Sequence, residues 1–248
     1  MGDRVRLTAL ANAALFVAAA VGLVTVDEDK PHGVLVAAAE ATARTGTAAF
    51  SLHASMRMGD EPTAIAATGR IDFERKRFTL VRETPRSELL VADGVTYTSL
   101  EAAAPQRWLV VDNRPRQTAA SPFGLGLTAD DPLAALDQLR RAGFARDVRA
   151  DGTEDVRGVP TTRWVADIDP AALSAASGRN RQFLEAIGLK EMRYSMWVGT
   201  DSVLRRVSTV AEGTIMSSSM TIEFFDFGTA APVEVPPPDQ VRHLELPD

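Results

Sequence analysis

The chain has 248 residues, of which 45% are hydrophobic and 24% charged, the composition of a globular protein with one large domain or two small ones. Its formal net charge of −6 and its lack of any Lys/Arg-rich run exclude a basic surface of the kind that holds nucleic acid. The absence of cysteine excludes disulfides, thiolate nucleophiles, cysteine-ligated zinc, iron–sulfur clusters and acylation of an N-terminal cysteine.

The N-terminus carries an uncharged, apolar segment at residues 7–26, which Arg4 and Arg6 precede and the acidic sequence DEDK follows. This order of charges matches the positive-inside rule, so we expect the body of the protein in the cell envelope, on the extracytoplasmic face of the plasma membrane. Two interpretations stay open. The segment is either a signal peptide cleaved at a small-residue site such as 18–20, or an uncleaved anchor of the roughly 20 residues that a bilayer core requires. A buried alanine-rich helix of a cytosolic fold is the least favoured alternative.

The first predicted element after the linker is a helix at residues 34–45. Leu35, Ala38 and Thr42 recur at helical spacing, and Gly46 follows as a helix stop.

Alternation of apolar and polar residues then predicts a series of strands. In AAFSLHASMRM the side chains of Phe50 and Leu52 share one face, whereas that of His53 lies on the other. The pair Asp93-Gly94 is a hairpin-turn signal. Strands are predicted in this part of the chain at residues 48–58, 63–73, 76–83, 87–92, 95–100 and 107–112.

The middle of the chain changes character, because residues 114–132 are rich in proline, glycine and small residues and are expected to form a loop. A compact helix follows at 131–143, with Pro132 in its first turn. Strands resume over 144–169, and 170–189 reads as one or two short helices. The last three strands are predicted at residues 190–200, 202–213 and 215–228.

Together these predictions give an α+β fold of nine to eleven antiparallel strands with two or three helical insertions and no βαβ alternation. The tail from Ala230 is rich in proline, cannot pair in a central strand and is expected along the surface. The expected organisation is residues 1–26 as signal peptide or membrane anchor, 27–33 as linker, 34–229 as one domain and 230–248 as a Pro-rich tail.

The last predicted strand places apolar bulk on both of its faces, with Met220, Ile222 and Phe224 on one and Phe225 and Phe227 on the other. A sheet with solvent on one side needs only one apolar face, and the sequence offers a single strongly patterned helix to cover many strands. This excess predicts an apolar cavity between sheet and helices, which the seven methionines suit because thioethers line adaptable apolar surfaces. A solidly packed core is the alternative, and the residue pattern alone leaves both open.

No arrangement of residues typical of catalysis is found. His32, His53 and His243 lie in the linker, on the polar face of a strand and in the tail, without the spacing of a metal site. GxSxG, P-loop and GxGxxG motifs are absent. The acid pairs at 130–131 and 167/169 are better explained as a helix cap and a strand end. We therefore predict a non-enzymatic protein without metal or cofactor.

Several motifs in combination carry a family resemblance: DPLAALDQLRRAG, DVRGVPTTRWVADID, MWVGTDSVLRRVS and the closing IEFFDFGTAAPVEVPPPDQV. Over roughly residues 34–241 the chain resembles the LppX/LprG-type lipoproteins of actinobacterial envelopes and, more distantly, the LolA/LolB carriers. The resemblance implies a strongly curved antiparallel half-barrel with helices plugging its concave side. It also implies an exported carrier that holds acyl chains of a lipid, glycolipid or lipoprotein. The family's lipobox cysteine is missing, so either the segment 7–26 anchors the protein in the cell membrane or the protein is released.

The residues expected to line the lipid-binding cavity are apolar side chains on the predicted strand faces: Phe50, Leu52, Met56, Ile65, Phe73, Leu80, Tyr97, Trp164, Met196 and Phe224. The assignment depends on the register of each strand, because a shift of one residue exchanges the two faces. The alternative function is an envelope sensory or regulatory protein that uses the same fold to bind a membrane partner protein.

Overall fold

The computed structural model describes residues 31–58, 61–83, 86–93, 95–99, 108–112, 145–171, 185–186 and 188–243. The apolar N-terminal segment, the helix predicted at 131–143 and most of 170–189 lie outside these ranges. None of the helices within them combines the length and apolar character needed to cross a bilayer.

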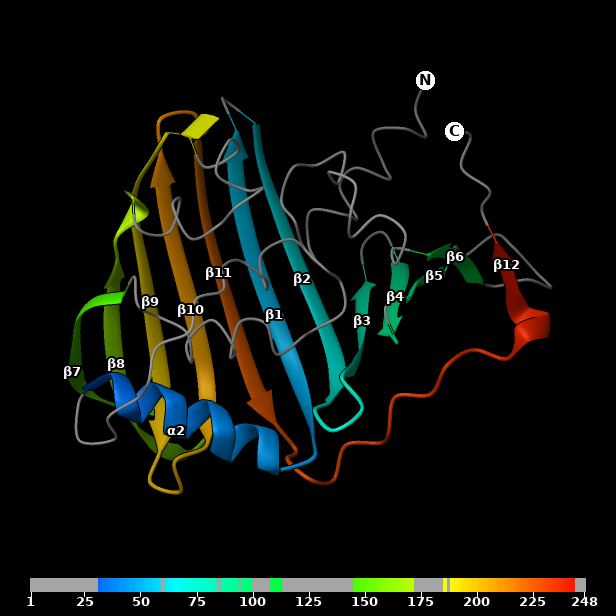
Figure 1. The fold of residues 1–248 in the computed structure, drawn as a ribbon, viewed down its shortest axis with the longest axis horizontal. Coiled ribbons are helices and arrows are strands. Elements are labelled where there is room, and N and C mark those ends of the chain that lie inside the picture. The colour runs from blue at the N-terminus through cyan, green and yellow to red at the C-terminus, as the bar shows by residue number, and fades with distance from the viewer. Residues whose placement is uncertain are drawn as a thin grey trace.

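Twelve strands form one open, curved sheet (Figure 1). Their order across the sheet is β12-β6-β5-β4-β3-β2-β1-β11-β10-β9-β8-β7, so the first and the eleventh strands pair at its centre. The strands are β1 (Thr47–Met58), β2 (Glu61–Asp72), β3 (Arg77–Glu83), β4 (Arg86–Ala92), β5 (Val95–Ser99), β6 (Trp108–Asp112), β7 (Ala145–Val156), β8 (Val159–Ile168), β9 (Leu189–Gly199), β10 (Leu204–Gly213), β11 (Met216–Phe225) and β12 (Val241–His243).

The first eleven strands correspond to the segments predicted from alternation, and they pair with one another antiparallel. The predicted turn at Asp93 joins β4 to β5, with Asp93 at a φ of 53°. The twelfth strand corrects two expectations, because it adds a strand within the tail and pairs parallel to β6. Its three residues are too few to show a periodicity. The prolines before it predict an irregular segment, although the chain pairs with the sheet again after them.

The helix α2 (Pro31–Arg44) begins slightly earlier than predicted, with proline as its first residue, and Gly46 follows it at a φ of 78°. Its apolar stripe, which includes Leu35, Ala38 and Ala39, packs into the main core of the sheet. We call the sheet surface against which α2 packs the helix face and the other surface the outer face. Of the helices expected on one side of the sheet, α2 is the one that the described residues contain.

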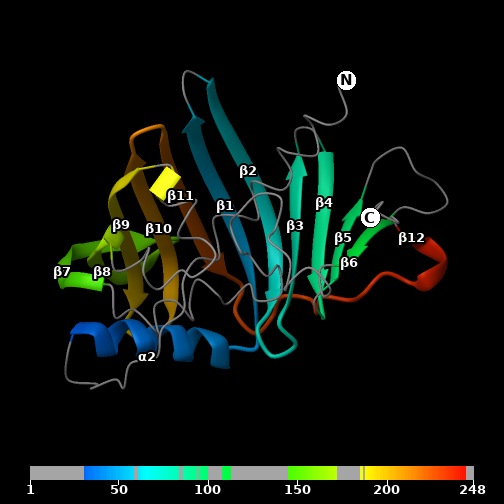
Figure 2. The ribbon, with the colours of Figure 1, turned by 45° about the horizontal axis from the view of Figure 1, so that its top comes forward.

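A buried threonine fixes the helix to the sheet. The Oγ1 atom of Thr42 donates a hydrogen bond to the Ala38 carbonyl at 2.7 Å and accepts one from the backbone N–H of Leu204 at 2.9 Å. Leu204 is the first residue of β10, so α2 lies across the ends of the strands near this point. Figures 1 and 2 both show α2 along one end of β7 to β11, away from β3 to β6.

The tail does more than run along the surface. After β11 it crosses to the far edge of the sheet through the 3-10 helix η3 (Pro238–Gln240) and ends in β12 (Figure 2). Val233 is only 1% exposed and forms a second, smaller core with Leu90, Ala92 and Trp108. These three sheet residues lie on the outer face, so this part of the sheet also buries apolar side chains on that face.

Candidate functional site

Eight of the ten side chains predicted as lining lie together on the helix face. Phe50 pairs in register with Phe224 of β11 and with Gly69 of β2, and the two phenylalanine rings lie 6.5 Å apart between centroids. The strand registers place the others on the same surface. They are Phe50, Leu52, Met56, Ile65, Leu80, Trp164, Met196 and Phe224.

The remaining two predicted residues, Phe73 and Tyr97, lie in different cores. Phe73 follows β2, donates its backbone N–H to the Gly46 carbonyl at 2.9 Å and is buried in the same core as the eight. Tyr97 pairs with Leu90 and packs in the small core under the tail. It therefore lies on the outer face, and the structure removes it from the predicted lining. In the sequence VTYTS the flanking threonines give no sign of which face is buried.

A glycine makes room for one of the aromatic side chains on the helix face. A Cβ atom at Gly69 would lie 2.4 Å from the Phe50 ring and 2.0 Å from the backbone carbonyl oxygen of Thr79. The Phe50 ring thus occupies the space that a side chain on β2 would need.

The apolar surface extends along the strands well beyond the helix. From Leu204, where Thr42 attaches α2, β10 continues through Val207 to Ala211 on the same face. At about 3.3 Å per residue, Ala211 lies roughly 20 Å from Leu204, whereas a helix with its side chains is only about 10 Å wide. Apolar side chains on this further part of the helix face are Ala54, Met56, Ile65, Ala67, Ala211 and Met220.

Three buried hydroxyl groups interrupt this apolar surface, and sequence reasoning missed them. Tyr194 of β9, Thr209 of β10 and Ser218 of β11 are each about 7% exposed. Tyr194 pairs with Thr209, and both lie on the helix face. Burial raises the pKa of Tyr194 to about 12, and the adjacent Thr209 hydroxyl offsets this only in part. Alternation with Val207 and Ala211 along β10 was the signal that could have placed Thr209 on the buried face.

The outer face of the same strands carries a polar row instead. Arg163, Trp197, Arg206, Glu223 and Ser51 are register partners across β8, β9, β10, β11 and β1. Arg206 donates to the Glu223 carboxylate at 2.9 Å, and the guanidinium groups of Arg163 and Arg206 lie 5.3 and 4.9 Å from the Trp197 ring. This row is therefore held by ion pairs and cation–π contacts.

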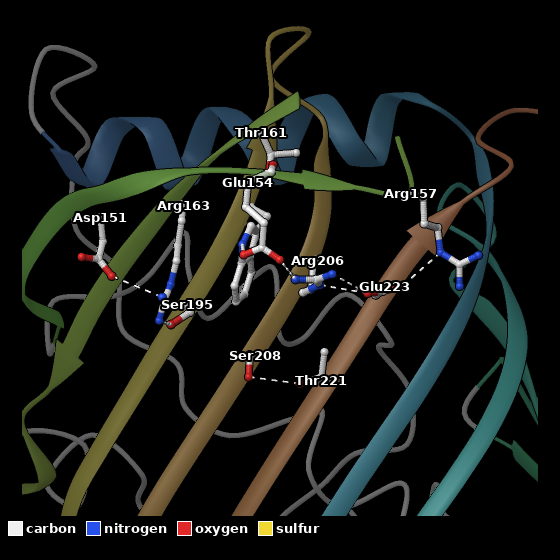
Figure 3. A network of polar contacts seen from close by, with 11 residues as sticks. Asp151, Glu154, Arg157, Thr161, Arg163, Ser195, Arg206, Ser208, Thr221 and Glu223 are labelled. Atoms are coloured by element: carbon white, nitrogen blue, oxygen red, sulfur yellow. Dashed lines mark hydrogen bonds and ion pairs between the residues drawn. The ribbon is translucent and has the colours of Figure 1, made fainter. Parts of the chain in front are cut away.

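The end of the β7–β8 hairpin crosses this row on the outer side of the sheet, with α2 behind it (Figure 3). Its Glu154 carboxylate accepts hydrogen bonds from Arg206 at 2.7 Å and from the Trp197 indole at 2.9 Å. Its Arg157 donates to Glu223 at 3.0 Å and to Ser51 at 3.2 Å, and covers the Phe225 ring at 3.9 Å. Several charged groups thus bind the hairpin to the outer face.

The protonation of this network follows from its hydrogen bonds. Donation by Arg206 and then by Trp197 lowers the pKa of Glu154 below its ordinary value of 4.5. The Asp167 carboxylate nearby has its pKa lowered mainly by a hydrogen bond from Arg193. Both acids are therefore ionised at neutral pH, and the outer face is a charged, internally paired surface.

A groove of about 490 Å³ lies on the outer face of β8 to β10, in the size range of ligand sites. Its walls include Arg163, Asp167, Arg193 and Trp197. Asp167 is already paired with Arg193 at 2.6 Å, and Arg163 with Asp151 at 3.4 Å. This groove is not the apolar cavity expected from the sequence. We take the helix face as the candidate site because apolar side chains concentrate there.

The fold and its apolar helix face define a curved-sheet protein with a helix packed on one side. No family model matches the chain. It is 31% identical over 98 residues to an uncharacterized 31.2 kDa protein of the rplA-rplJ intergenic region of Streptomyces griseus. That match spans 36% of this chain and 32% of the Streptomyces protein, about a third of the length of each.

Two solved structures share the fold along most of the chain. LprF from Mycobacterium bovis superposes with a TM-score of 0.50 at 15% identity, over 84% of this chain and 96% of LprF. The lipoprotein LppX from Mycobacterium tuberculosis gives a TM-score of 0.50 at 13% identity, over 82% of this chain and 99% of LppX. The chain therefore has the fold of LprF and LppX, and the resemblance inferred from its sequence motifs is confirmed for the fold.

Proposed function

We propose that the chain is an exported, non-enzymatic carrier that binds acyl chains of a lipid, glycolipid or lipoprotein against its helix face and moves them within the cell envelope. The observation that carries the proposal is the continuation of buried apolar side chains beyond the width of α2, from Val207 to Ala211 on β10 and across to Ile65 on β2. The fold shared with the lipoprotein LppX supports it.

Such a carrier works by burial alone. Each methylene group removed from water contributes about 0.8 kcal/mol, so ten methylenes contribute roughly 8 kcal/mol before the cost of ordering the chain is subtracted. A site of this kind needs few polar contacts and no nucleophile, acid or metal. The proposed lining is the set of predicted residues on the helix face together with Phe73.

The N-terminal segment, residues 1–26, completes the proposal as an export signal or membrane anchor. Because no cysteine is present for acylation, this segment is the proposed link to the membrane if the protein is retained there. Detecting the mature N-terminus by mass spectrometry separates cleavage from retention.

The test uses the full chain isolated from a bacterial envelope fraction. Organic extraction followed by mass spectrometry is expected to recover stoichiometric lipid, and the protein is expected to transfer fluorescent lipid between vesicles. Ala67→Phe is designed to fill the helix face and to lower both signals several-fold. Its neighbour Ala66 is exposed on the outer face, so Ala66→Phe is the matched control and is expected to behave as wild type.

Recovery of no lipid together with no vesicle transfer would contradict the proposal. Capture of a stoichiometric membrane protein by a lipid-free chain would favour the regulatory alternative. Circular dichroism of both alanine variants verifies that each is folded before these outcomes are interpreted.

A further inference from the structure

The side chain of Thr209 is buried on the helix face without a hydrogen-bond partner. It is 7% exposed, and its Oγ1 atom contacts no donor or acceptor at hydrogen-bond geometry. The Thr209 side chain partly lowers the pKa of the neighbouring Tyr194 hydroxyl, so the two groups lie close together. Their contact does not have the geometry of a hydrogen bond. A buried hydroxyl without a partner costs free energy, so such groups call for an explanation.

Other hydroxyl groups in the described part of the chain show that this fold satisfies hydroxyls elsewhere. Buried Thr42 both donates and accepts. On the outer face, Thr221 and Ser208 pair at 3.1 Å. Thr209 is the one hydroxyl group among the buried, unpaired side-chain atoms of the described residues, the others being guanidinium nitrogens.

The surroundings of Thr209 restrict what can meet it. Its register partners are Tyr194 on β9 and Met220 on β11, and Ala54 lies beyond Met220 on β1. The phenol of Tyr194, whose pKa burial raises further to about 12, is neutral at pH 7, so no charge stands beside Thr209 on these strands. A neutral hydroxyl among apolar neighbours matches a neutral acceptor oxygen better than a charged headgroup.

Thr209 also lies within the part of the helix face that α2 does not reach. It is five residues along β10 from Leu204, roughly 15 Å at the rise of a strand, whereas α2 with its side chains is about 10 Å wide. The orphan hydroxyl is thus located where the proposed acyl chain binds.

We infer that Thr209 determines specificity by donating a hydrogen bond to the carbonyl oxygen of an acyl ester, so that the protein prefers ester-linked lipids to ether-linked lipids, which lack this carbonyl. This inference rests on the proposed function. A saturated chain has no acceptor and leaves Oγ1 unpaired, whereas an ester carbonyl supplies one without adding charge. Thr209 acts as a positioning contact within a largely apolar site.

The experiment compares two vesicle lipids that differ only in linkage, a diacyl phosphatidylglycerol and its dialkyl ether analogue of equal chain length. The full-length wild type is expected to bind and transfer the ester lipid about five- to tenfold better than the ether lipid, the size of one neutral hydrogen bond. Thr209→Val removes the hydroxyl at nearly constant shape and is expected to lower ester transfer to the ether level. Thr209→Ser keeps a donor and is expected to retain the preference.

Two controls separate this role from a structural one. Thr221→Val removes a hydroxyl from the outer face and is expected to leave the ester-to-ether ratio unchanged. The lipid-free Thr209→Val protein is expected to unfold at the wild-type temperature or above it, because an unsatisfied group has been removed. An ester-to-ether ratio that is the same in wild type and Thr209→Val overturns this inference alone. Binding of neither lipid overturns the proposed function as well.

Discussion

The two faces of the same five strands, β8 to β11 and β1, solve the problem of burial in opposite ways. On the helix face, Leu52, Met196 and Ile222 form an apolar core that one helix covers in part. On the outer face, Arg206, Glu154 and their neighbours hold a hairpin against the sheet through ion pairs. The comparison teaches that one face of these strands is stabilised by paired charges and the other by apolar packing.

The largest expected effect comes from emptying the helix face. Leu52 is 1% exposed, and Leu52→Ala is expected to lower the free energy of unfolding by about 3 to 5 kcal/mol, because it removes buried methylenes and leaves a cavity. The adjacent His53 is exposed on the outer face, so His53→Ala is expected to change it by less than about 0.5 kcal/mol. Urea unfolding measures both, and equal losses would contradict the assignment of faces.

Overfilling the helix face is expected to cost about 3 kcal/mol. In Gly69→Ala the new Cβ meets the Phe50 ring and the backbone carbonyl of Thr79, and backbone cannot move aside easily. Gly158, in the β7–β8 turn, has a φ of 77° and open space around it, so Gly158→Ala carries only the backbone strain of about 1 to 2 kcal/mol. A smaller loss at position 69 than at 158, measured by thermal unfolding, would show that Phe50 does not occupy this space.

The attachment of α2 is expected to contribute about 1 to 3 kcal/mol through one side chain. Thr42→Val keeps the shape but removes the oxygen that accepts the Leu204 N–H, leaving a buried donor unsatisfied. Thr42→Ser restores the oxygen and is expected to recover most of the loss. Hydrogen exchange of the Leu204 amide is the direct readout, and unchanged protection in Thr42→Val would contradict the role of this bond.

The smallest expected effect is the pH dependence of the outer face. Because the pKa of Glu154 is lower in the folded protein than its ordinary 4.5, its stabilising contribution is full above pH 4.5 and is lost as the pH falls through the folded value. For a carboxylate this exposed we expect less than about 1 kcal/mol. Glu154→Gln should therefore destabilise at pH 7 but not at pH 3, by urea unfolding. Thr209→Val titrates no group, so its difference from wild type should be the same at both pH values.

Most of the sheet could be predicted from the sequence because alternation is a local property. Alternation within β1 shows that Phe50, Leu52 and Met56 share a face, whichever strands pair with it. The prediction for Tyr97 was wrong because its short strand lacks a clear alternation of apolar and polar residues. Packing of the tail, with Val233, determines which face is buried there. Long-range contacts such as Arg157 with Glu223 could not be read at all, since they depend on how far the hairpin bends over the sheet.

The sequence predicted a set of apolar residues for the candidate site, but not the three buried hydroxyl groups among them. Alternation with Val207 could place Thr209 on the buried face, but only the register shows that Tyr194 and Met220 are its neighbours there. Absence of a partner is a property of three-dimensional arrangement, so no spacing rule could have found it.

The parallel pairing of β12 with β6 has a consequence for the order of folding. In the described structure, β12 is the neighbour that covers the free edge of β6, and Val233 covers Trp108 beside it. Both lie far after β6 in the sequence, so they are synthesised well after it. Until β12 and Val233 have been synthesised, they cannot cover the edge of β6 and the ring of Trp108, which stay without this cover. During that interval they are a natural binding site for a chaperone and a starting point for aggregation.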